Sequence, residues 1–157
     1  YEKGTDKIEF LISANPGEEL KPLSKIASGG EMSRIMLAVK SVLSDTDNVE
    51  AMIFDEIDTG VSGRAAQRIA EKMGKLARTR QILCITHLAQ IAAMADYQYL
   101  IEKHTEGDST KTTVSLVTDE RRREELARII GGVKVTELTL NAAQEMLDMA
   151  AEQKKKS

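Results

Sequence analysis

Cysteine is almost absent from this chain: Cys84 is the only one among 157 residues. A single cysteine excludes an intrachain disulfide framework and is typical of a reducing compartment, so we expect a cytoplasmic location. Long apolar runs are absent as well, since none approaches the roughly 20 residues of a membrane-spanning helix. The first four residues lack the charge and the apolar stretch of a signal peptide. We therefore expect no membrane partner, and a start at Tyr1 rather than at Met suggests a piece of a longer protein.

Neither sign of charge is in large excess. The 22 basic and 25 acidic residues give a formal net charge of -3. A surface that binds nucleic acid everywhere through phosphate neutralisation needs an excess of positive charge, so any contact with DNA must be local or lie outside this sequence. Two basic runs, at 121–123 and 154–156, are expected to be solvated, because such runs usually form exposed charged faces.

The hydrophobic pattern predicts an α/β fold with parallel strands, flanking helices and an antiparallel hairpin, in one domain over 1–157. Alternation over 7–13 predicts a half-buried strand, and the apolar runs at 51–54 and 82–85 predict buried strands. Helices are expected from Met32 onward, at about 62–78, at 88–95, at 118–130 before Gly131-Gly132, and at about 136–151 with a fraying tail. The alternating segments near 97–102 and 114–116 predict the hairpin. The predicted buried stripes of the first two helices are Met32, Ile35, Met36, Val39, Val42 and Leu43, then Ala66, Ile69, Ala70, Met73 and Ala77.

Three polar residues follow the two central strands. Asp55 and Glu56 come directly after the first strand, and His87 follows the second. The order strand, helix, strand implies a right-handed crossover and a parallel pair. Because ligands of open α/β sheets bind at the carboxyl ends of parallel strands, we expect these residues to lie at a binding site.

The two carboxylates can have different roles, because adjacent residues of a strand point to opposite sides. Asp55 is suited to the hydration shell of Mg²⁺, a hard cation that favours oxygen ligands and keeps several waters. Glu56 is suited to orient and deprotonate a water that attacks a γ-phosphate. For this pair alone, a strand that leaves the core into an acidic loop is the simpler interpretation.

The sequence Ser28-Gly29-Gly30 precedes the first predicted helix. The free N–H groups and the positive dipole end of a helix attract anions, and glycine lets a phosphate approach closely. A capping serine and a flexible turn explain these three residues equally well. His87 is suited to hydrogen-bond a terminal phosphate, although a lone histidine at a strand end is more often structural. Arg34, one turn into the helix, is expected to be an exposed helix charge, and the alternative is an approach to phosphate or to an acid of a partner.

The chain contains no phosphate loop of the form G-x-x-x-x-G-K-S/T. That loop supplies the backbone cradle and the lysine for the β- and γ-phosphates of a nucleotide. The sequence therefore predicts half of an ATP site, and we expect this chain alone to show no meaningful ATP hydrolysis.

The order and spacing of these motifs make coincidence a poor explanation. S-G-G-E opens a helix, an apolar strand ends in D-E, a D-x-G turn follows, and a second strand ends in T-H. This succession resembles the C-terminal lobe of ABC-type ATPase heads. Residues 10–18, 27–34 and 86–92 resemble most closely the RecN family of bacterial DNA repair proteins, and the resemblance covers essentially the whole chain. The resemblance identifies the signature motif as Ala27, Ser28, Gly29, Gly30 and Glu31, Walker B as 52–56, the D-loop as Asp58, Thr59 and Gly60, and the switch histidine as His87.

The resemblance implies an SMC-like ATPase that binds ATP and Mg²⁺ and acts in DNA double-strand break repair and recombination, in the bacterial cytoplasm near the nucleoid. Its partners would be its own N-terminal head lobe, which carries the phosphate loop, a second copy of the head, and DNA through the full-length protein. The signature would act in trans on the nucleotide of the second head. Asp55, Glu56 and His87 would act in cis, and Asp58 would couple the two sites.

Two other classes of protein fit the same motifs. One is another ABC-type ATPase head, either from a chromosome-structuring SMC protein or from a transporter nucleotide-binding domain. Upstream heptads would favour an SMC-like molecule, and a phosphate loop shortly upstream in continuous sequence would favour a transporter. The other is a binding module that keeps the fold and only dimerises, although Glu56 weighs against it because a decayed site has no need for a base.

Overall fold

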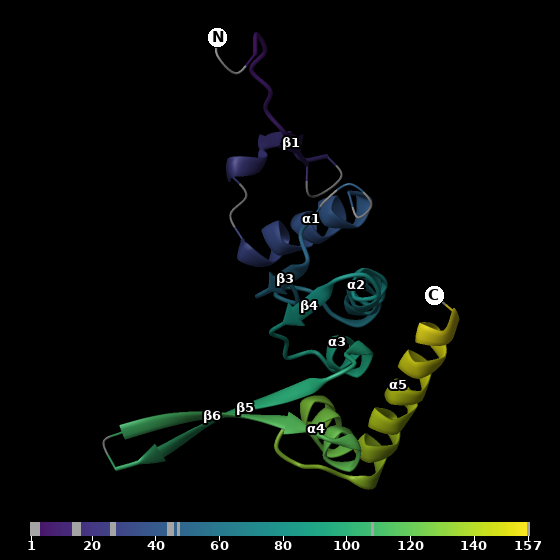
Figure 1. Ribbon diagram of the computed structural model, residues 1–157. Coiled ribbons are helices and arrows are strands. Elements are labelled where there is room, and N and C mark those ends of the chain that lie inside the picture. Colours follow the sequence, from purple (N-terminus) through teal and green to yellow (C-terminus); the bar gives the residue numbers. More distant parts are fainter. Residues whose placement is uncertain are drawn as a thin grey trace.

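The computed structural model describes residues 4–13, 17–25, 28–43, 46, 48–107 and 109–156. Its elements form an α/β arrangement of small sheets and flanking helices (Figure 1). In chain order they are β1 (Leu11–Ile12), β2 (Lys21–Pro22), the 3-10 helix η1 (Leu23–Lys25), α1 (Gly29–Val42), β3 (Ala51–Phe54), α2 (Gly63–Leu76), β4 (Gln81–Cys84), α3 (Ala89–Met94), β5 (Gln98–Glu106), β6 (Ser109–Val117), α4 (Asp119–Gly131) and α5 (Glu137–Lys156).

The central unit is the predicted parallel pair. Strand β3 pairs with β4 in parallel, with Ala51 opposite Gln81 and Phe54 opposite Cys84, and α2 connects the two strands. The predicted stripe of α2 is largely confirmed, because Ala66, Ile69, Ala70 and Met73 are buried. The carboxyl ends of β3 and β4 therefore lie side by side, which places the acidic residues and His87 at one edge of the pair.

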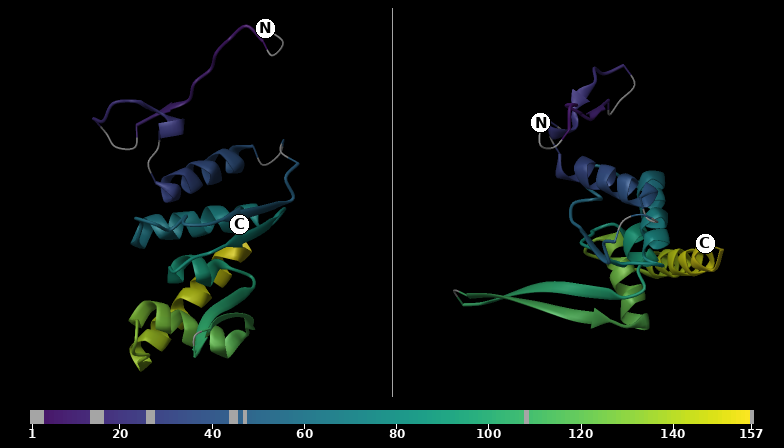
Figure 2. Two further views of the ribbon diagram at one scale, coloured as in Figure 1. Left: turned by 90° about the vertical axis from the view of Figure 1, so that its left-hand side faces the viewer. Right: turned by 45° about the horizontal axis from the view of Figure 1, so that its top comes forward.

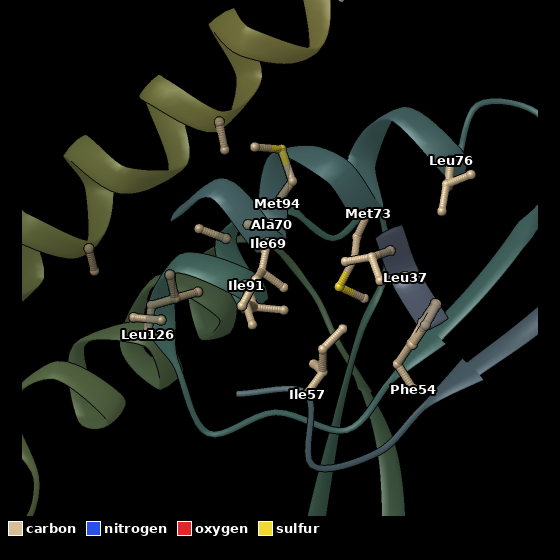
Figure 3. Close-up of a cluster of buried hydrophobic side chains, with 14 of the residues drawn as sticks. Leu37, Phe54, Ile57, Ile69, Ala70, Met73, Leu76, Ile91, Met94 and Leu126 are labelled. Atoms are coloured by element: carbon tan, nitrogen blue, oxygen red, sulfur yellow. The ribbon is translucent and has the colours of Figure 1, made fainter. Parts of the chain in front are cut away.

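The core lies between this pair and the helices on one side of it. Figure 3 shows Leu37 of α1, Met73 of α2 and Phe54 of β3 pointing toward one another. Ile57, directly after the acidic pair, and Leu126 of α4 are fully buried. The first of these anchors the loop that carries Asp55 and Glu56, because burial of an isoleucine side chain contributes about 1.5–3 kcal/mol.

The other face of the parallel pair is open. Ile53 is 73% exposed, Leu83 47% and Ile85 54%, so the prediction that these strands are buried is wrong for this face. The predicted stripe of α1 is also wrong: Leu37 is buried, whereas Met36 and Val42 are exposed. Periodicity identifies a helix or strand, but an apolar face is buried only where another element covers it.

The hairpin is confirmed and extends away from the helices in two views (Figures 1 and 2). Strands β5 and β6 pair antiparallel from Gln98 opposite Val117 to Glu106 opposite Ser109. Tyr99, Ile101, Val114 and Leu116 alternate onto one face of the hairpin, and all four are exposed.

Both ends of the chain differ from the sequence-based expectation. The predicted strand over 7–13 is reduced to Leu11–Ile12, and Ile8 and Phe10 are exposed. Helix α5 continues to Lys156, so the predicted fraying of the tail is wrong. Lys154 of this tail donates to the carbonyl of Ala95 at 3.1 Å and pairs with Asp96 at 2.6 Å.

The basic run at 121–123 is not simply solvated either. Arg122 is half-buried and donates to the carbonyls of Ala92 and Ala93, both at 3.1 Å. Burial lowers its pKa from the usual value, against the raising effect of Asp96 and Asp119. Helix α4 is thereby tied to the end of α3, and it terminates as predicted at Gly132, whose φ is 69°.

Candidate functional site

The N-terminus of α1 is capped by Ser28. The side-chain oxygen of Ser28 accepts a hydrogen bond from the backbone N–H of Glu31 at 3.1 Å. This bond satisfies one of the N–H groups that a helix leaves unpaired at its start. Accepting it uses a lone pair of Oγ, and the hydroxyl hydrogen can still donate to an anion. Ala27, also predicted for this site, lies outside the described residues.

The acidic loop, residues 55–60, follows β3 directly. Glu56 has a φ of 56°, in the left-handed region that is unfavourable for a residue with a side chain unless its surroundings hold it there. Its N–H donates to Oδ1 of Asp55 at 2.9 Å, and its carbonyl accepts the N–H of Thr59 at 3.0 Å. Gly60 ends the loop with a φ of 74°. The residues Asp55 and Glu56 are both exposed at the surface.

Gly29 and Gly30 lie directly against this loop. A Cβ atom added to Gly29 would collide with Oε2 of Glu56. One added to Gly30 would lie 2.8 Å from the Glu56 carbonyl oxygen and 3.0 Å from Cβ of Thr59. Only glycine therefore lets the helix tip and the Glu56 side chain occupy these neighbouring positions. The structure thus brings four of the predicted site residues together within one chain: Gly29, Gly30, Glu56 and Thr59.

Two residues of α1, Ser33 and Arg34, also contact the acidic loop. Oγ of Ser33 donates to the carbonyl of Asp55 at 2.8 Å. Nη1 of Arg34 donates to the carbonyls of Ile57 at 3.2 Å and Thr59 at 2.8 Å. The expectation that Arg34 is an exposed helix charge is therefore wrong, because the residue is half-buried and bonded to the loop.

Asp58 joins the acidic loop to the end of β4. It is 2% exposed, and its Oδ2 accepts hydrogen bonds from Oγ1 of Thr86 at 2.5 Å and from the backbone N–H of His87 at 2.9 Å. Nδ1 of His87 lies 3.1 Å from the same oxygen, while the His87 side chain is 73% exposed. Asp58 thus orients the imidazole so that its Nε2 edge is the one available to a ligand. Thr86 is a further residue that sequence reasoning missed.

Cys84, the last residue of β4, has an unreactive thiol. Burial raises the pKa of its thiol to about 12, with smaller raising effects from the charges of Asp58 and Asp55. Because the thiolate is the reactive form of cysteine, Cys84 stays a neutral thiol at physiological pH. It therefore supplies no nucleophile or metal ligand to the site.

The side chains of the site suit a Mg²⁺ ion bound through water molecules. In the described part of the chain, they do not form a site in which several side chains coordinate the metal directly. Within the described ranges, no group of three or more His, Cys, Asp or Glu side chains is placed to hold a metal ion. Asp55 offers one exposed carboxylate, and Mg²⁺ commonly keeps several waters while using one or two carboxylates and phosphate oxygens. Asp55 would hold the hydrated ion, which would neutralise phosphate charge.

In the part of the chain that the structure describes, the site lies at the surface, because Asp55, Glu56 and His87 are all exposed. A cavity does occur between β5 and α4, lined by residues such as Ile101, Arg121 and Arg128, and it contains none of the predicted site residues. The acidic loop touches the helix tip on one side and His87 on the other, and the side chains of Asp55 and Glu56 remain exposed. A triphosphate bound there would need further protein around it.

Comparisons with known proteins give one consistent family. No protein-family profile matches the chain. The chain is 54% identical over 149 residues to the DNA repair protein RecN of Halalkalibacterium halodurans and 52% identical over 149 residues to RecN of Bacillus subtilis; each match covers 95% of this chain and 26% of the relative. It is 49% identical over 152 residues to RecN of Treponema pallidum, which covers 97% of this chain and 26% of the relative.

A solved structure from work on ATP-driven dimerization and DNA-stimulated activation of SMC ATPases is more distant. It is 23% identical with a TM-score of 0.48, over 76% of this chain and 79% of that one, a likeness too weak to decide the fold. The sequence matches carry the assignment, and this chain spans about a quarter of the length of the RecN proteins that it matches. Over that quarter, the chain is similar along nearly its whole length to RecN DNA repair proteins.

Proposed function

We propose that this chain is the C-terminal lobe of the head of a RecN-like ATPase that acts in the repair and recombination of broken DNA. The observation that carries the proposal is the acidic loop, which contacts the Ser28-Gly29-Gly30 helix tip at one end and His87 at the other. Taken with the RecN matches, this arrangement supports phosphate chemistry, since a helix N-terminus that suits an anion lies beside two carboxylates and an imidazole that suit hydrolysis.

Each group has a role set by its surroundings. Glu56, exposed and held in an unusual backbone conformation, would accept the proton of the water that attacks the γ-phosphate. His87, with Nδ1 turned to Asp58, would donate from Nε2 to a phosphate oxygen when both nitrogens are protonated. Asp55 would hold Mg²⁺ through water. Asp58 would couple the sites through His87, because its own carboxylate is buried within this chain.

Two further parts of the protein would complete the site of this chain: an N-terminal lobe and a second copy of the head. Both faces of a parallel sheet are normally covered by other elements, but the apolar face with Ile53, Leu83 and Ile85 is open. We propose that an N-terminal lobe carrying the phosphate loop covers this face. The helix tip at Ser28, Gly29 and Gly30 would face the nucleotide held by a second copy of the head. ATP would then join two heads, and cleavage of the γ-phosphate would remove the contacts that favour the closed pair.

The similarity to RecN proteins is also the basis for proposing where the full-length protein acts and how it meets DNA. DNA would be bound by the full-length protein, since the formal charge of -3 gives this chain no general attraction for nucleic acid. Among the described helices, none is long and apolar enough to cross a lipid bilayer. We propose action at the bacterial nucleoid in the cytoplasm. The alternative of another ABC-type head, from an SMC protein or a transporter, is less well supported because the similarity to RecN proteins extends over nearly the whole chain.

The proposal is tested by Glu56→Gln in the full-length protein, with Glu145→Gln on the exposed face of α5 as the matched control. We expect Glu56→Gln to bind ATP normally, to lose turnover, and to accumulate as ATP-bound dimers in size-exclusion chromatography with light scattering. Glu145→Gln should behave as the parent protein does. Turnover of Glu56→Gln at the parent rate would show that Glu56 is not the base.

A further inference from the structure

The acidic loop is held to α1 through three alternate carbonyl groups. Ser33 donates to the carbonyl of Asp55 at 2.8 Å, and Arg34 donates to those of Ile57 at 3.2 Å and Thr59 at 2.8 Å. The bonds from Arg34 are charge-assisted and use one guanidinium nitrogen for two acceptors. A pair of adjacent side chains on the helix therefore fixes every second peptide of the loop.

Gly30 is what allows Arg34 to make these bonds. Gly30 lies four residues before Arg34 and so on the same face of the helix. A Cβ atom on Gly30 would lie 3.0 Å from Nη1 of Arg34 and 2.8 Å from the carbonyl oxygen of Glu56. The missing side chain thus leaves the space in which the guanidinium group passes between helix and loop. The second glycine of the helix tip has a role within its own chain as well as a place at the surface.

These bonds act on the backbone of Glu56. The carbonyls of its two neighbours, Asp55 and Ile57, are fixed by Ser33 and Arg34, and its own carbonyl accepts the N–H of Thr59. A residue with a positive φ persists only where its surroundings over-determine it. Ser33 and Arg34 supply that constraint on the side of α1, and buried Ile57 supplies it on the side of the core.

The far side of the loop is fixed separately. Asp58 is bonded to Thr86 and His87 at the end of β4, so the loop is held between α1 and β4. A displacement of α1 is transmitted first to the peptides around Glu56, because those are the peptides that the helix bonds directly. The Glu56 side chain lies next to Gly29 at the tip of the same helix.

We propose that Ser33 and Arg34 are positioning residues, which set the orientation of Glu56 according to the position of the helix tip. This inference rests on the proposed function. When the tip engages the nucleotide of the second head, α1 and the acidic loop move as one body, and Glu56 is held toward its own water. The base is then correctly oriented only in the assembled pair of heads.

The test compares Arg34→Met, Arg34→Lys and Ser33→Ala in the full-length protein, with Arg78→Met, at an exposed position just after α2, as the matched control. We expect Arg34→Met to lower kcat by ten- to a hundredfold, in line with the effect of misplacing a reacting group by about 1 Å. The KM for ATP, nucleotide-dependent dimerisation and the melting temperature should change little. Arg34→Lys keeps a charged donor and should recover part of kcat, Ser33→Ala should lower kcat by a smaller factor, and Arg78→Met should have no effect.

A second measurement separates positioning from an independent contact. Residues that act as one unit are not additive in kinetics, so Arg34→Met added to Glu56→Gln should reduce the residual turnover by less than about twofold. Parent-like kcat in Arg34→Met, or a rise in KM that accounts for the whole loss, would overturn the inference, as would a multiplicative loss in the double variant. If Arg34→Met does not fold, the inference is tested with Ser33→Ala and Arg34→Lys. A parent-like kcat in both of these variants would also overturn the inference.

The parallel Glu56→Gln measurement distinguishes this inference from the proposed function. If Glu56→Gln removes turnover and the Arg34 variants do not, the positioning role alone is wrong. If Glu56→Gln retains turnover, the assignment of the base is wrong and the positioning role fails with it.

Discussion

The two glycines at the tip of α1 are expected to respond differently to substitution by alanine. The added Cβ atom of Gly30→Ala meets the backbone carbonyl oxygen of Glu56 at 2.8 Å, Nη1 of Arg34 at 3.0 Å and Cβ of Thr59 at 3.0 Å. Two of these three neighbours belong to a loop that is bonded on both sides, so the backbone itself must shift. The added Cβ atom of Gly29→Ala meets only the Glu56 side chain, which can rotate away.

The size of the effect follows from two opposing terms. Overpacking of this kind costs about 1–3 kcal/mol, whereas alanine in place of glycine in a helix stabilises by about 0.5–1 kcal/mol. For Gly30→Ala we expect a net loss of about 1–2 kcal/mol in the free energy of unfolding. For Gly29→Ala we expect a change within about 0.5 kcal/mol, because the only displaced group is the end of an exposed side chain.

Urea unfolding of the 157-residue chain, followed by circular dichroism, measures both values, provided that the m-values of the variants agree. Turnover of the full-length protein gives the complementary result, since Gly29→Ala should lower kcat by displacing the Glu56 carboxylate. The reasoning is refuted if Gly29→Ala destabilises the chain more than Gly30→Ala does, or if Gly29→Ala turns over ATP as fast as the parent protein.

Three further predictions concern other parts of the site. The 157-residue chain alone should show no ATP hydrolysis above background in a phosphate-release assay; robust turnover that disappears in Glu56→Gln would contradict the account. Cys84, whose thiol pKa is raised to about 12 mainly by burial, should react far more slowly with iodoacetamide at pH 8 in the native protein than after denaturation, as followed by peptide mass mapping; equal rates would show that the thiol is neither buried nor neutral. Asp58→Asn should lower the free energy of unfolding by about 1–3 kcal/mol and reduce kcat, because the neutral amide is a weaker acceptor for Thr86 and His87; an unchanged melting temperature and unchanged kcat would refute the orienting role of Asp58.

The features that depend on residues near each other in sequence were predictable. The α2 stripe, the parallel pairing of β3 with β4, the hairpin and the helix end at Gly132 are all confirmed. The capping role of Ser28 is likewise present in the structure. Periodicity and capping chemistry determine the α2 stripe, the hairpin and the helix ends locally. The parallel pairing of β3 with β4 joins more distant residues, but it follows from the order strand, helix, strand.

The features that depend on distant residues were not predictable. The bonds from Ser33 and Arg34 reach carbonyls that lie 22 to 25 residues further along the chain, and a hydrophobic pattern contains no information on which carbonyl a side chain will meet. The exposure of Met36 and Ile53 was missed for a related reason. An apolar pattern states that a face is suited to burial, but whether another element covers that face depends on the rest of the assembly.

The central claim is that the helix tip of one copy and the acidic loop of the other serve the same nucleotide. The most direct measurement mixes two inactive full-length variants, Ser28→Arg and Glu56→Gln, before ATP is added. If the tip acts in trans, each mixed dimer contains one intact site, and random exchange in a two-fold dimer should restore about a quarter of the parent turnover. If the mixture remains as inactive as its two components, although subunit exchange is shown by light scattering of tagged copies, the helix tip and Glu56 serve one site within a single chain and the account is contradicted.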